Sequence, residues 1–205
     1  MGKRIAVVGV GALGGYVGGW LAHTGEDVTL IDFWPENIEA IRSRGLELDG
    51  VTPEEKITVR NAKTMHLTEM EALSRQKPVD IAFVSMKSYD TEWATQLIKQ
   101  YLSPDGYVVS LQNCLNEERI AGVVGWGKTV GMVASLISVD MFEAARSGVP
   151  SPRVATSTPC SGWARCMAAS PGALRNCATW WAASTRPRPR PTCGASAGPS
   201  SARTA

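Results

Sequence analysis

Near its N-terminus the chain runs Arg4-Ile5-Ala6-Val7-Val8-Gly9-Val10-Gly11-Ala12-Leu13-Gly14. The apolar run that ends at Gly9 predicts a strand buried on both faces, and the residues after Gly11 have helical character. In a Gly-x-Gly-x-x-Gly turn the first glycine permits the tight turn, the second admits a pyrophosphate, and the third lets helix and strand pack closely. We therefore expect contacts with a bound dinucleotide from Gly9, Gly11, Ala12, Leu13 and Gly14.

A second strand is predicted at residues 27–32, and it ends on an acid, Asp32, 18 residues after Gly14. An acid in this place accepts hydrogen bonds from the adenosine ribose 2′-hydroxyl, which favours NADH over NADPH. The next basic residue is Arg42, so the segment after Asp32 offers no cation to a 2′-phosphate. The alternative is that Asp32 only caps the loop after the strand.

Strands and helices alternate as far as residue 145. This alternation predicts an α/β fold, a Rossmann-type doubly wound parallel sheet, in one NAD(P)-binding domain of residues 1–145. The expected strands are residues 4–9, 27–32, 46–49, 56–60, 79–85, 107–111 and 129–137, and the expected helices are residues 12–24, 35–44 and 91–101.

Polar residues follow two of the later strands. Met86 and Lys87 come after the strand at 79–85, and Asn113 comes after the strand at 107–111. Since ligands bind outside the carboxyl ends of parallel strands, we expect all three to contact the cofactor and Lys87 and Asn113 also to face the substrate. Lys87 would pair with a phosphate or carboxylate, and Asn113 with a carbonyl, a hydroxyl or the nicotinamide amide. The alternatives are a solvated lysine and a turn-forming asparagine.

These features together resemble the ketopantoate reductase (2-dehydropantoate 2-reductase) family. The resemblance rests on the glycine turn, on Lys87, and on Gln112-Asn113 followed by Asn116-Glu117-Glu118, and it covers residues 3 to about 144. It implies a cytoplasmic oxidoreductase of pantothenate biosynthesis that reduces ketopantoate, a 2-keto acid, to pantoate with NAD(P)H. It also implies a possible homodimer for the full-length family, and contacts of Lys87 and Asn113 with cofactor and substrate.

Two positions depart from the family pattern. Cys114 stands where the family usually has glycine after Gln-Asn, which would tighten that loop. Asp32 stands where members that prefer NADPH tend to have a basic or neutral residue. The family habit therefore suggests NADPH, whereas Asp32 suggests NADH.

The composition changes sharply at about residue 146. Residues 1–146 hold 14 Lys and Arg and all 19 Asp and Glu, whereas residues 147–205 hold seven Arg, eight Pro and four Cys but no Lys, Asp, Glu, Ile, Phe or Tyr. The resemblance implies a second, mostly helical domain that supplies a catalytic lysine and a carboxylate, and residues 146–205 do not resemble it. We expect a disordered, irregular tail there.

The genetic code offers an explanation for this tail. In the neighbouring reading frame, residues 160–168 allow Gly-Glu-x-x-Gly and residues 192–201 allow Leu-Trp-Gly-Glu-Arg-Trp-Ser-Lys-Leu, which resemble two segments of the family's second domain. We hypothesise a frameshift near codons 144–158, which predicts a truncated form that binds nucleotide with little turnover. The alternatives are a non-catalytic NAD(H)-binding module, a related reductase for another 2-keto or 3-hydroxy acid, and a poorly folded chain.

Other classes of function find little support in the sequence. There is no stretch of 18 apolar residues, and the five cysteines have no paired CxxC spacing, so we expect no membrane span and no metal site. The Arg-Pro repeat at 186–191, the pair Trp180-Trp181 and the pair Cys160/Cys166 could suggest a peptide, nucleic-acid or metal site. The frameshift hypothesis makes all three incidental, and we expect no nucleic-acid partner.

Overall fold

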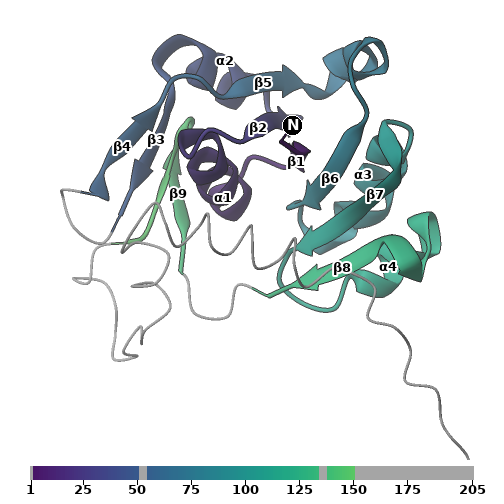
Figure 1. Ribbon diagram of the computed structural model, residues 1–205. Helices are drawn as coiled ribbons and strands as arrows, with labels where there is room; N and C mark the ends of the chain where they lie inside the picture. The colour runs from purple at the N-terminus through teal and green to yellow at the C-terminus, as the bar shows by residue number, and fades with distance from the viewer. Residues whose placement is uncertain (1, 51–54, 134–137, 151–205) are drawn as a thin grey trace, which may run out of the picture.

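The computed structural model describes residues 2–50, 55–133 and 138–150. Its main sheet has six parallel strands in the order β5-β2-β1-β6-β7-β8 (Figure 1). The strands are β1 (Arg4–Val8), β2 (Asp27–Asp32), β5 (Lys63–His66), β6 (Val79–Val84), β7 (Leu102–Leu111) and β8 (Thr129–Met132). The strand order reverses between β1 and β6, which is where a doubly wound sheet opens its ligand crevice.

The central strand β1 explains how both faces of the sheet are covered. Its side chains alternate, so that Ile5 and Val7 pack in the core beside α1, whereas Ala6 and Val8 pack in the core beside α3 and α4. The helices are α1 (Ala12–His23), α2 (Pro35–Arg44), α3 (Thr91–Lys99) and α4 (Glu117–Val124), with 3₁₀ segments η2 (Leu67–Arg75), η3 (Ser88–Asp90) and η4 (Trp126–Lys128). A strand with two buried faces needs mainly apolar residues, as β1 has from Ile5 to Val8.

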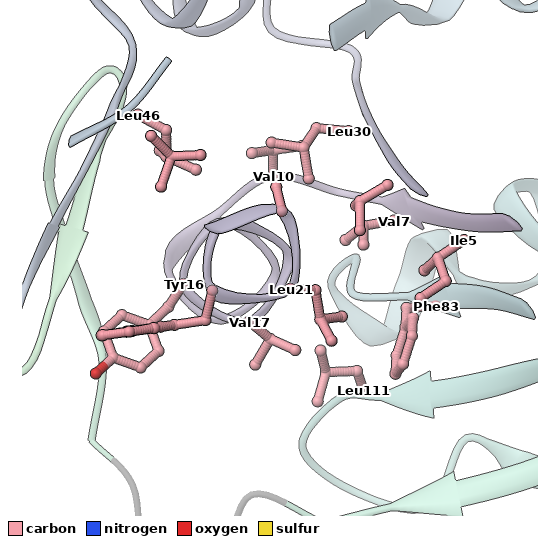
Figure 2. Packing of buried hydrophobic residues seen from close by; sticks show 14 of the residues in the cluster. Ile5, Val7, Val10, Tyr16, Val17, Leu21, Leu30, Leu46, Phe83 and Leu111 are labelled. Carbon is pink, nitrogen blue, oxygen red and sulfur yellow. The ribbon is translucent and has the colours of Figure 1, made fainter. Parts of the chain in front are cut away.

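Helix α1 lies between the main sheet and a second sheet, as Figures 1 and 2 show. Gly18 faces Leu30 of β2, and Gly19 faces Leu46 of β3 (Leu46–Asp49). A Cβ atom at Gly19 would lie only 2.8 Å from Leu46 Cδ2, so the helix approaches this sheet closely. A helix covered on both sides has no polar face, which explains the apolar sequence of α1.

The second sheet has four strands in the order β4-β3-β10-β9. Its members besides β3 are β4 (Ile57–Val59), β9 (Asp140–Glu143) and β10 (Arg146–Gly148). β10 runs parallel to β3 and antiparallel to β9. The sheet thus joins residues from two distant parts of the chain around α1.

The regular structure continues beyond residue 145, where the sequence placed the end of the domain. Ser147 is buried in β10, and Arg146 donates from Nε and Nη2 to Asp49 Oδ2 at 2.9 and 2.7 Å. These contacts attach residues 146–148 to β3, a pairing that local sequence does not reveal. Of the irregular tail expected at residues 146–205, residues 151–205 lie outside the described residues.

The α/β Rossmann-type fold is confirmed, and α2 has the bounds expected from the sequence. β7 begins at Leu102 instead of residue 107, and the strand expected at 129–137 ends at Met132, with residues 134–137 outside the described ranges. β5, α4, β9, β10 and the 3₁₀ segments were not expected from the sequence. β5 and β10 are short and contain polar residues, so pairing with β2 and β3 determines their conformation.

Candidate functional site

The turn between β1 and α1 contains three glycines with different physical requirements. Gly9 has φ +98°, and a Cβ atom there would lie 2.7 Å from Met86 Sδ. A Cβ atom at Gly14 would overlap the carbonyl oxygen of Gly9. Gly11 has φ −75°, which any residue adopts, and a Cβ atom there would meet nothing within 4 Å. The fold therefore requires glycine at positions 9 and 14 but not at position 11.

Gly11 is also the N-cap of α1. No side chain caps this helix end, and no acidic residue lies in the first turn. The N-terminus of a helix carries a partial positive charge and N–H groups that lack helical partners. An open glycine at such a helix end provides space and charge for an anionic group such as a pyrophosphate.

Asp32, at the end of β2, is almost fully buried and accepts four internal hydrogen bonds. Oδ2 accepts from Val10 N at 3.2 Å and from Asn37 Nδ2 at 2.9 Å. Oδ1 accepts from Phe33 N at 2.7 Å and Trp34 N at 3.3 Å. The carboxylate thus joins the glycine turn to the loop before α2. It fixes this loop, as in the alternative role considered for Asp32. Its contact with a ribose stays a prediction.

Asn37 is a functional candidate that the sequence analysis missed. It is fully buried, donates to Val10 O and Asp32 Oδ2 at 2.9 Å each, and accepts from Ala145 N at 2.8 Å. Ala145 itself adopts φ +60°. One amide therefore connects the glycine turn, β2 and the turn before β10. No local pattern could reveal it, because Ala145 is 108 residues away.

The loops after β6 and β7 are joined by a second set of buried amides. Gln112 Nε2 donates to Met86 O at 2.6 Å and to Thr91 Oγ1 at 2.8 Å. Asn116 Nδ2 donates to Asn113 O at 2.9 Å and to Ser88 Oγ at 3.1 Å. These bonds hold the two loops together at the carboxyl edge of the sheet.

The predicted cleft residues lie on these two loops. Lys87 and Asn113 are exposed, whereas Met86 is buried and covers Gly9. The structure thus places all three at the same edge as the glycine turn, and their contacts with cofactor and substrate stay predictions. Gln112 and Asn116 belong to the motif on which the family resemblance rests, but nothing in the sequence indicates that they hold the loops.

Cys114, the departure from the family's glycine, is exposed and has φ +69°. This left-handed backbone conformation is the one that glycine adopts without strain, which explains why the family has glycine there. The tightening of the loop expected from the sequence stays a prediction.

Arg42 is the first basic residue after Asp32, and carboxylates already pair with it. Its guanidinium lies 2.5 Å from Glu69 Oε2 and 3.4 Å from Glu39 Oε1. The hydrogen bond from Arg42 holds the pKa of Glu69 below its ordinary value. Arg42 therefore offers less charge to a ligand than its position in the sequence implies.

Neither a metal centre nor a membrane helix is found in the part of the chain that the structure describes. No group of three or more His, Cys, Asp or Glu side chains lies close enough together to hold a metal ion within residues 2–50, 55–133 and 138–150. Over the same ranges, no helix has the length and apolar character that a bilayer span requires.

Comparison with known proteins agrees with this geometry. The family model described as ketopantoate reductase PanE/ApbA matches residues 5–145. The chain belongs to this family. The match includes the glycine turn, Asp32 and both loops at the carboxyl edge, and it confirms the resemblance inferred from the sequence.

Individual relatives support the family assignment, and this chain covers only part of the length of each. The 2-dehydropantoate 2-reductase of Pyrococcus horikoshii is 39% identical over 123 residues, which are 60% of this chain and 37% of the relative. The crystal structure of 2-dehydropantoate 2-reductase from Geobacter metallireducens has a TM-score of 0.61 at 29% identity, covering 71% of this chain and 46% of the other. The PanE/ApbA family ketopantoate reductase from Ralstonia eutropha has a TM-score of 0.60 at 25% identity, covering 72% and 46%. The chain thus spans less than half the length of these relatives.

Proposed function

We propose that this chain is the cofactor-binding part of an NAD(P)H-dependent reductase that converts ketopantoate to pantoate. The observation that carries the proposal is Gly11, a glycine that neither its φ of −75° nor its surroundings require. A bound pyrophosphate explains it, because only a glycine would let the backbone approach the phosphates there. The proposed substrate, ketopantoate, is the one for which the family and its relatives are named.

The residues of the site suit a nicotinamide dinucleotide. Gly9, Gly11, Ala12, Leu13 and Gly14 form a turn with the shape and charge that the pyrophosphate needs. The cofactor supplies a hydride to the ketone of the substrate. Lys87 would attract the substrate carboxylate or the charge that develops on the ketone oxygen, and Asn113 would orient the nicotinamide amide or the substrate by hydrogen bonding.

NADH is the cofactor that we propose within this class. Asp32 places a negative charge at the end of β2, and Arg42 is paired with Glu69 at 2.5 Å, so a 2′-phosphate would meet repulsion without a free partner. Titration with the two cofactors tests this preference. Tenfold or tighter binding of NADPH would contradict it.

For this 205-residue chain we propose nucleotide binding with little turnover. Residues 147–205 contain no Lys, Asp or Glu, so they cannot supply the lysine and carboxylate that the resemblance implies for the reaction. General acid catalysis contributes on the order of 10²–10⁴-fold, and we expect turnover of ketopantoate to be reduced at least that much relative to full-length members. Normal turnover would refute this part of the proposal.

The frameshift hypothesis is the explanation that we propose for this composition. Sequencing the gene across codons 144–158 and onward tests it directly. A neighbouring frame that stays open and encodes the two family segments would support it. A stop codon between these two segments would contradict the frameshift hypothesis.

The central test of the proposed function compares two substitutions at open glycines. Gly11 and Gly122 both have nothing within 4 Å of an added Cβ atom, but Gly122 lies in α4, away from the turn. We expect Gly11→Ala to keep the thermal stability of the protein and to weaken NADH binding about 100-fold in calorimetry. Gly122→Ala should change neither binding nor fold. Equal NADH affinity in all three proteins would contradict the proposal.

A further inference from the structure

Two consecutive aromatic side chains are exposed directly after β2. Phe33 is 56% exposed and Trp34 is 39% exposed, although both rings are large and apolar. Aromatic side chains contribute strongly to cores and to binding interfaces. Their place in the sequence, between Asp32 and the N-terminus of α2, puts them beside the proposed cofactor site.

Hydrogen bonds hold the backbone of this pair, whereas both side chains are partly exposed. Asp32 Oδ1 accepts from the N–H groups of both residues, at 2.7 and 3.3 Å. The carbonyl of Phe33 accepts from His66 Nε2 at 3.1 Å, and Pro35 follows at the first position of α2. A rigid backbone reduces the entropy that an aromatic ring loses when a ligand stacks on it.

Asp32 has little capacity left for a ligand. An ionised carboxylate offers about four acceptor sites, and Asp32 already accepts four internal hydrogen bonds. The adenosine of a dinucleotide bound at the glycine turn lies outside the carboxyl end of β2. Recognition at that end therefore requires groups other than the Asp32 oxygens.

We infer that Phe33 and Trp34 form an adenine-binding platform, and that Asp32 acts as a positioning residue that fixes their backbone. The ligand class is an adenine nucleotide, whose purine ring stacks on one or both aromatic rings. Stacking of a base on an aromatic side chain is worth about 1–3 kcal/mol by alanine substitution. The inference rests on the proposed function, since it assigns the adenosine half of the same cofactor site.

Fragments of the cofactor separate the two halves of the site. Calorimetry on the full 205-residue chain with 5′-AMP, nicotinamide mononucleotide and NADH measures each half independently. We expect Phe33→Ala and Trp34→Ala to weaken 5′-AMP and NADH about tenfold, and nicotinamide mononucleotide by less than twofold. Phe33→Tyr and Trp34→Phe should restore most of the affinity, because they keep the ring.

The matched control is Trp126→Ala. Trp126 is 66% exposed and lies in η4, next to β8 at the opposite edge of the main sheet. Its removal should leave all three affinities unchanged. If the double variant Phe33→Ala/Trp34→Ala binds 5′-AMP as tightly as the unmodified chain, the platform is refuted while the proposed function stands. If the unmodified chain does not bind NADH, the proposed function itself fails, and the platform with it.

Discussion

The two halves of the crevice are built on the same principle but present different chemistry. On the side that we propose for the adenosine, buried Asp32 and Asn37 hold the loop that carries Phe33 and Trp34. On the other side, buried Gln112 and Asn116 hold the loops that carry the exposed Lys87 and Asn113. In both halves the buried polar groups are hydrogen-bonded within the protein, and the candidate ligand-contacting side chains on the loops that they hold are exposed.

This difference matches the two ends of a nicotinamide dinucleotide. An adenine ring requires an apolar surface for stacking, whereas the reacting end requires polar groups that respond to a changing charge. Under the proposed function, one half of the site gives affinity and the other half faces the chemistry. Substitutions in one half should leave the other half unaffected, except at the glycine turn that both share.

The largest effect is expected at Gly14, in the shared turn. A Cβ atom there overlaps Gly9 O, which is a backbone atom and cannot rotate away as the end of a side chain can. Gly14→Ala should lower the free energy of unfolding by about 3 kcal/mol or more and abolish binding of both cofactor fragments. Urea denaturation and calorimetry measure the two effects.

Gly122→Ala is the control for this prediction. Its position in α4 is open and helical, so alanine should raise the free energy of unfolding by about 0.5–1 kcal/mol. If Gly14→Ala is as stable as the unmodified chain, then the turn does not require a glycine at position 14. The inference that both halves of the site depend on this turn would then be contradicted.

A smaller effect is expected at Asp32. Asn at this position has one oxygen and one NH₂ group, so two of the four internal donors would lose their acceptor and face another donor. Asp32→Asn should lower the free energy of unfolding by about 2 kcal/mol, since buried polar groups left unpaired cost this much. Asp27→Asn, at the other, half-exposed end of β2, should stay within about 0.5 kcal/mol.

A deoxy-nucleotide tests Asp32 without any substitution. If its oxygens are used internally, 5′-AMP and 2′-deoxy-AMP should bind the unmodified chain within threefold of each other. If Asp32 accepts from the ribose 2′-hydroxyl, as the sequence predicted, 2′-deoxy-AMP should bind about tenfold more weakly. The second result would assign recognition of the adenosine to the Asp32 carboxylate instead of the aromatic pair.

The sequence predicted those parts of the site that residue type alone determines. Glycine at positions 9 and 14 is required by a positive φ and by a close contact, so the turn was recognisable from the spacing. The packing around Asn37 was not predictable, because its partner Ala145 is 108 residues away. β10 was missed for the same reason, since Arg146, Ser147 and Gly148 form a strand only when paired with β3. Long-range hydrogen bonds, and not local propensity, determine these segments.

The smallest effect is expected at Lys87, and its pattern should be the reverse of that at Phe33. Lys87 is exposed and serves as the N-cap of η3 only through its backbone, so Lys87→Ala should leave the melting temperature unchanged. Exposed ion pairs are worth about 0.2–1 kcal/mol, which corresponds to a loss of at most about fivefold in the affinity for NADH or ketopantoate. This loss should shrink as salt is added, because salt screens exposed charges. The affinity for 5′-AMP should not change, since we propose that the adenosine binds at the other end of the site. A loss of 5′-AMP binding in Lys87→Ala would show that the two halves are coupled. It would contradict the inference that they bind the two ends of the cofactor independently.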